Sequence, residues 1–81
     1  MKVQVRLFAA VRQAVGRDTV EVELPDEATV ADVRDRLMAL FPAAAPLAAS
    51  ATWALDARYA GSAARVPVGA VVACIPAVSG G

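Results

Sequence analysis

The chain has 81 residues, of which 58% are hydrophobic, and its eight basic and eight acidic side chains cancel at neutral pH. This length makes one domain with one modest core, and the neutral charge excludes the basic surface that nucleic acid or an anionic membrane would require. Histidine is absent and Cys74 is the one cysteine. The sequence therefore lacks the commonest general base and any cysteine-only metal site, and we expect no bound metal.

Two strands and a short helix are predicted before Pro25. Residues 2–8 and 19–24 each alternate apolar and polar side chains, the period typical of strands with one buried face. Between them, residues 9–15 carry apolar side chains at helical spacing. Gly16 suits the left-handed conformation that often ends a helix.

The main helix is predicted over residues 29–41, where apolar side chains recur at helical spacing. Thr29 can cap its first turn, and Asp32, three residues later, can complete a capping box. Pro42 ends the helix. The alanine-rich residues 43–50 show no period, which indicates a loop with room for one turn of helix.

The rest of the chain predicts a hairpin and a central strand. Residues 52–60 form the hairpin, which turns at Asp56, a residue that tolerates positive φ. Residues 61–69 are a connection rich in small side chains, and residues 70–76 form an apolar run typical of a strand buried on both faces. Strands gathered around one main helix predict an α+β fold, a mixed sheet in the β-grasp pattern formed by residues 1–76.

Beyond Pro76 the side chains are small and the sequence ends in two glycines, so we expect residues 77–81 to form a flexible tail. Glycine can enter a channel that excludes other side chains, and the Gly81 carboxylate is a nucleophile that could attack the α-phosphate of ATP. Most glycine-rich chain ends are simply frayed. Here a predicted central strand leads directly into the tail, which favours a functional one. The predicted site is the tail residues Val78, Ser79, Gly80 and Gly81.

Three motifs spread over the chain carry a family resemblance. They are Phe8-Ala9-x-x-Arg12-x-x-x-Gly16, the helix opening Thr29-Val30-Ala31-Asp32, and the ending Ile75-Pro76-Ala77-Val78-Ser79-Gly80-Gly81. With these motifs the sequence resembles the small subunit of molybdopterin synthase, the MoaD-type ubiquitin-like sulfur carriers of the MoaD/ThiS superfamily. It resembles the shorter thiamine-pathway carriers less, because they lack the first motif. It departs from the family in Ala70-Val71-Val72, where acidic residues are common.

The resemblance implies a carrier with no catalytic side chains and no bound cofactor of its own. An E1-like enzyme would use ATP to adenylate Gly81, and a sulfurtransferase would supply the sulfur that makes a thiocarboxylate. The tail would then enter the large subunit of molybdopterin synthase and donate sulfur in molybdenum cofactor synthesis. We expect no nucleic acid or membrane partner and a cytoplasmic location, because the N-terminus is not a signal peptide and no apolar run reaches ~20 residues.

Two local features have alternative interpretations. If they are adjacent in the fold, Phe8, Ile75 and Pro76 would form an exposed apolar patch beside the tail and a partner interface. The alternative is that Phe8 simply covers the short helix. Cys74 shares a strand face with Val72, where a cysteine usually behaves as a small hydrophobic side chain and not as a reactive thiol.

Three alternatives to molybdopterin synthesis stay open from the sequence. The first is a sulfur carrier for thiamine or cysteine synthesis. The second is a ubiquitin-like modifier conjugated to other proteins through Gly81. The third is an interaction module whose tail has no chemical role, because a fold alone does not determine a pathway.

Overall fold

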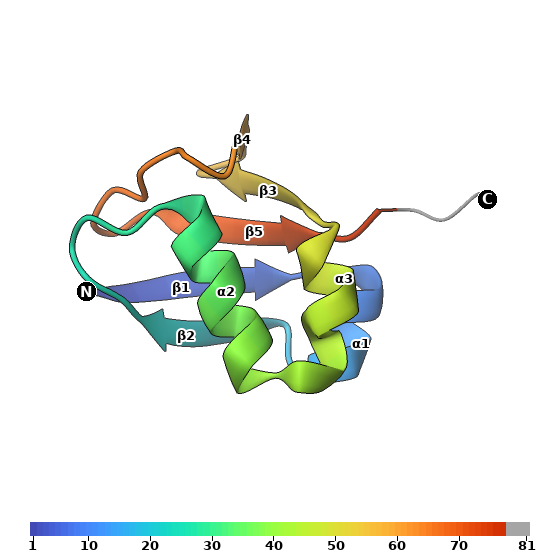
Figure 1. Ribbon diagram of the computed structural model, residues 1–81. Helices are drawn as coiled ribbons and strands as arrows, with labels where there is room; N and C mark the ends of the chain where they lie inside the picture. Colours follow the sequence, from blue (N-terminus) through green and yellow to red (C-terminus); the bar gives the residue numbers. More distant parts are fainter. Residues whose placement is uncertain (78–81) are drawn as a thin grey trace.

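In the computed structural model, which describes residues 1–77, five strands form a mixed sheet in the order β2-β1-β5-β3-β4 (Figure 1). β5 lies at the centre, parallel to β1, and the other neighbouring pairs are antiparallel. The elements in chain order are β1 (Lys2–Leu7), α1 (Ala9–Val15), β2 (Thr19–Glu23), α2 (Val30–Leu40), the 3₁₀ helix η1 (Pro42–Ala44), α3 (Ala45–Ala49), β3 (Thr52–Leu55), β4 (Arg58–Ala60) and β5 (Val71–Ile75). The predicted β-grasp fold is confirmed.

The first helix ends as the sequence predicts. Gly16 has a φ of +83°, and its N–H donates to the Arg12 carbonyl at 2.8 Å. The Leu7 N–H donates to the Asp18 carbonyl at 2.8 Å, so the chain returns beside β1 and continues as β2. A glycine is favoured at this position because other residues are strained at positive φ.

The predicted capping box opens α2. The Thr29 N–H donates to the Asp32 carboxylate at 2.8 Å, and the Asp32 N–H donates to the Thr29 hydroxyl at 3.4 Å. These bonds satisfy backbone groups that the first turn of a helix leaves without partners. The helix lies across one face of the sheet (Figure 1). Its fully buried side chains are Val30, Val33 and Leu37.

Residues 43–50, predicted as a loop, are mostly helical, because η1 continues directly into α3. Proline is well tolerated in the first turn of a helix, where its missing N–H is not needed, and Pro42 and Pro46 occupy such positions. Alanine has the highest helix propensity, and Ala44 and Ala48 are 0% exposed. An alanine-rich segment shows no apolar period, so the sequence pattern predicted a loop with room for one helical turn where the structure has two consecutive short helices.

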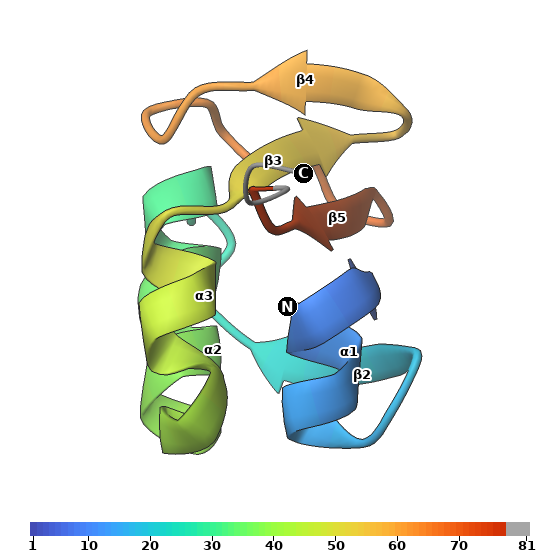
Figure 2. The same ribbon diagram turned by 90° about the vertical axis from the view of Figure 1, so that its right-hand side faces the viewer.

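The helices cover one face of the sheet only. Figure 2 views the sheet from one end, with α2 and α3 stacked together on one side of it. The prediction that β5 is buried on both faces is therefore wrong for one of them: β5 is fully buried only on the face that the helices cover. Val72 and Cys74 face the core and are 0% exposed, whereas Val71, Ala73 and Ile75 are half-buried on the open face. All five side chains are apolar, so the sequence does not distinguish the two faces.

The buried stripe of α2 makes a testable contribution to stability. Leu37→Ala should lower the free energy of unfolding by about 3 kcal/mol, because it leaves a cavity at a fully buried position. Urea denaturation followed by the fluorescence of Trp53, which is 5% exposed, measures the change. Leu40→Ala is the matched control in the same helix: its side chain is 45% exposed, and we expect a loss below about 1 kcal/mol. Equal losses in the two variants would contradict this account of the core.

Candidate functional site

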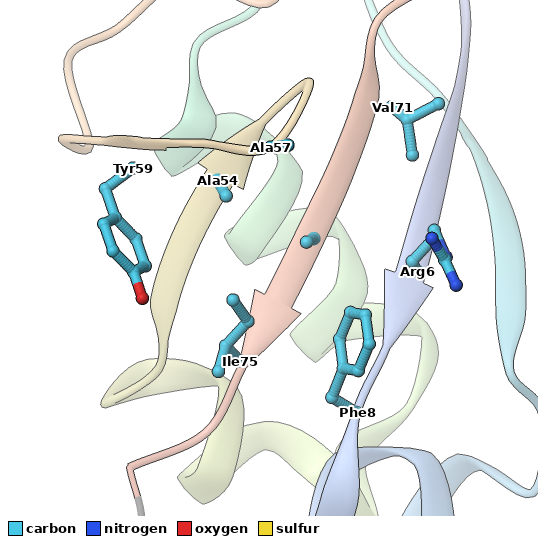
Figure 3. A pocket seen from close by; sticks show the side chains of 8 residues that line it. Arg6, Phe8, Ala54, Ala57, Tyr59, Val71 and Ile75 are labelled. Atoms are coloured by element: carbon cyan, nitrogen blue, oxygen red, sulfur yellow. The ribbon is translucent and has the colours of Figure 1, made fainter.

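The open face of the sheet carries a pocket of about 260 Å³ (Figure 3). Side chains from β1, β3, β4 and β5 line it, together with the first residue after β1 and one residue of the β3–β4 turn. These lining residues are Arg6, Phe8, Ala54, Ala57, Tyr59, Val71, Ala73 and Ile75. The pocket is mostly apolar and runs along β5, from Val71 at its start to Ile75 at the end that leads toward the tail.

The strand register brings Phe8 and Ile75 together. Arg6 is level with Ala73 and Leu7 with Cys74, so the next residue along each parallel strand comes to the same edge. Figure 3 shows Phe8 and Ile75 on neighbouring strands at one end of the pocket. The predicted pairing of these two residues in one apolar surface is therefore present in the structure.

Pro76, predicted as the third member of that patch, is buried and does not line the pocket. Alternation along β5 explains this, because Ile75 faces the open side and the next residue points to the covered side. The exposed apolar surface therefore extends from Ile75 back along the sheet, toward Ala73 and Tyr59, and not forward to Pro76.

Arg6 is the one charged side chain among the described residues that line the pocket. Its guanidinium carbon lies 5.5 Å from the centroid of the Phe8 ring, within the range of a cation–π contact. This contact places a positive charge beside an apolar floor. A partner that fits this pocket would therefore present an apolar side chain with a carboxylate next to it.

The β3–β4 turn forms the opposite wall of the pocket. Asp56 and Ala57 have φ values of +46° and +69°, the two positive values of a type I′ turn. The Asp56 carboxylate accepts a hydrogen bond from the Val71 N–H at 2.9 Å, and the Asp56 N–H donates to the Val71 carbonyl at 2.9 Å. The turn is thus fixed to the start of β5. Tyr59, 79% exposed, extends the wall and was not predicted from the sequence.

The rest of the open face is charged. Lys2 on β1 lies beside the acidic residues Glu21 and Glu23 of β2, with Glu23 directly opposite it in the register. The Lys2 ammonium is 4.0 Å from the Glu21 carboxylate. One half of this face, over β1 and β2, is therefore polar and mostly charged, and the other half, over β5, β3 and β4, is mostly apolar.

Cys74 is a core side chain, as the sequence favoured. It is 0% exposed, on the face of β5 that α2 and α3 cover. Burial raises the pKa of its thiol from 9.0 to about 12, because the thiolate would be desolvated there. A thiol that stays protonated at neutral pH is a poor nucleophile, so Cys74 lacks the properties of a redox or sulfur-relay group.

The predicted tail residues Val78, Ser79, Gly80 and Gly81 lie outside the described residues. The structure follows the chain from β5 through the buried Pro76 to Ala77, which is exposed. Within residues 1–77, no group of three or more acidic or cysteine side chains could hold a metal ion. No helix in that range is long and apolar enough to cross a membrane.

Comparison with known proteins now identifies the family. A sequence model of the ThiS family matches residues 5–81. The chain belongs to the ThiS family. Among solved structures, this ThiS-family chain is similar to SAMP1 from Haloferax volcanii, with 26% identity, 100% of each chain covered and a TM-score of 0.87. It is also similar to a putative molybdopterin converting factor subunit 1 from Pyrococcus furiosus, with 29% identity, 96% of this chain and 99% of that one covered, and a TM-score of 0.84.

A third similar structure is a complex of subunits 1 and 2 of molybdopterin-converting factor from Helicobacter pylori 26695. The identity is 17%, each chain is covered over 100% of its length, and the TM-score is 0.69. At this identity the similarity shows the fold. The predicted MoaD/ThiS membership is confirmed by the family match over residues 5–81.

The burial of Cys74 predicts how stability depends on pH. Between about 9 and about 12 the folded chain keeps the thiol proton that the unfolded chain loses, so the free energy of unfolding should fall as pH rises through this range. Urea denaturation of the wild type and of Cys74→Ala at pH 8 and pH 10.5 measures the effect. The fall should be steeper in the wild type than in the variant. Equal pH dependence in both would show that the thiol is not desolvated.

Proposed function

We propose that this chain is a sulfur carrier and the small subunit of a molybdopterin synthase. The observation that carries the proposal is the ThiS family match over residues 5–81, which includes four strands, the end of β1 and the Gly80-Gly81 ending. The similarity to molybdopterin converting factor subunit 1 of Pyrococcus furiosus supports this pathway over thiamine or cysteine synthesis. We place the protein in the cytoplasm, where ATP is available.

In this proposal the reacting atoms belong to Gly81 and its partners. A carboxylate oxygen of Gly81 attacks the α-phosphorus of ATP on an E1-like enzyme, and pyrophosphate leaves. The outer sulfur of a sulfurtransferase persulfide then attacks the acyl carbon, AMP leaves, and a thiol attacks the resulting acyl disulfide to release the Gly81 thiocarboxylate and a second disulfide. The resulting thiocarboxylate donates its sulfur in the active site of the large synthase subunit. Glycine at this position keeps the carbonyl carbon open to each attacking group.

The pocket on the open face is the proposed docking surface for these partners. It combines Phe8 and Ile75 with the positive charge of Arg6, and its Phe8–Ile75 end lies where the chain leaves β5. Residues 78–81 can extend at most ~14 Å beyond Ala77. A partner bound at the pocket would therefore hold its own active site within reach of Gly81. Subunit 2 in the Helicobacter pylori complex is the kind of partner that we propose.

A protein modifier is the second candidate function. The similarity to Haloferax volcanii SAMP1, a small archaeal modifier protein, favours it over a passive interaction module. Both candidates share the activation of Gly81 and differ in the nucleophile that attacks the acyl-adenylate. Sulfur gives a carrier, whereas a lysine amine of another protein gives a modifier.

Sulfur loading at Gly81 tests the carrier proposal directly. After incubation with its activating enzyme, ATP and a sulfur donor, the chain should gain the mass of one sulfur in place of one oxygen. Intact-mass spectrometry measures the change, and trypsin should place it in the peptide that follows Arg65. Deletion of Gly81 should abolish loading and leave the urea midpoint unchanged. A deletion variant that still loads sulfur would refute the mechanism.

The docking surface is tested by placing a charge in the pocket. Ile75→Asp should weaken binding to the large subunit by ~30-fold or more, the loss expected for an apolar anchor worth about 2 kcal/mol. Val68→Asp is the matched control, because Val68 is 78% exposed and lies outside the pocket. Calorimetry measures both affinities, and circular dichroism checks the fold. Equal affinities for the two variants would place the interface elsewhere.

A further inference from the structure

The sequence contains one lysine. Of the eight basic residues, seven are arginine, whose guanidinium stays protonated and does not act as a nucleophile, and Lys2 is the eighth. We propose that Lys2 is a modification site, the amine that accepts the activated Gly81 of a second copy and joins copies head to tail by an isopeptide bond. This proposal rests on the activation of Gly81 proposed above.

Lys2 is the accessible amine of the described chain. Its side chain is 68% exposed at the start of β1, and its contact with Glu21 is a 4.0 Å pair between exposed groups, which holds it only weakly. The Met1 amino group, in contrast, donates to the Leu24 carbonyl and to the Asp26 carboxylate, and the Met1 side chain is 5% exposed. The Met1 amine is therefore engaged by two acceptors, whereas the Lys2 amine has one weak contact and is the more available nucleophile.

The strand directions prevent a copy from modifying itself. β1 and β5 both run away from the N-terminal end of the sheet (Figure 1), and Gln4 is level with Val71. Lys2 thus lies before the start of β5 and Ala77 lies after its end, roughly 26 Å away at ~3.3 Å per residue. Residues 78–81 reach at most ~14 Å, and a lysine side chain adds about 6 Å. The isopeptide bond must therefore join two copies.

Formation of this isopeptide bond requires only the Gly81 acyl-adenylate, which is already an intermediate of the proposed function. The Lys2 amine attacks the Gly81 carbonyl carbon, a C–N bond forms, the C–O bond to AMP breaks, and the amine gives a proton to solvent. The donor copy keeps its own Lys2 and the acceptor copy keeps its own Gly81, so the step can repeat. Head-to-tail contacts that do not close on themselves give open chains.

The test uses the full chain with its activating enzyme, ATP and Mg²⁺, with and without a sulfur donor. Without the donor, we expect covalent dimers and longer adducts, each link formed with loss of one water. Acylated Lys2 resists trypsin, so the diagnostic product is the peptide of residues 1–6 carrying residues 66–81 as a branch. Supplying the sulfur donor should reduce these adducts, because the two nucleophiles compete for the same acyl group.

Lys2→Arg is the matched variant, because it keeps the positive charge beside Glu21 and removes the nucleophile. It should lose the adducts completely while its sulfur loading equals that of the wild type. Adducts that persist in Lys2→Arg would place the link at the Met1 amine and overturn the proposal. Sulfur loading at Gly81 without any adduct would overturn this proposal alone, and an unactivated Gly81 would overturn the proposed function with it.

Discussion

Parallel pairing of β1 with β5 constrains the rest of this molecule, because parallel strands cannot be joined by a tight turn. The chain between them must cross from one end of the sheet to the other, and α2, the longest helix of the described residues, covers the sheet on the way. Because both strands run toward the same end, their final side chains meet where the chain leaves the sheet. The candidate docking surface and the exit of the tail are thus two results of one strand pairing.

The two faces of the sheet have different roles: one forms the core and the other carries the pocket. Side chains alternate along β5, so Val72 and Cys74 lie in the core and stabilise the fold, whereas Ile75 lies on the open face and lines the pocket. The buried side holds the one thiol in a protonated state. In the proposed function, reactivity lies at the chain end and recognition at the pocket on the open face.

Local rules allowed much of the fold to be predicted from the sequence. The capping box at Thr29, the left-handed Gly16 and the turn at Asp56 each depend on residues within a few positions of one another. The features that the sequence did not predict depend on contacts between residues far apart in the sequence. Whether β5 has an uncovered face depends on where the helices pack, and whether Tyr59 borders a pocket depends on the order of the strands. Neither leaves a periodic signal in the sequence.

The outer strands of the sheet bear on how such a protein behaves at high concentration. β2 presents Glu21 and Glu23, and β4, on the other edge, is three residues long and begins with Arg58. Short or charged edge strands resist pairing with the edges of other molecules. Both edges of this sheet therefore carry features that disfavour edge-to-edge pairing with other molecules, in a chain that is 58% hydrophobic.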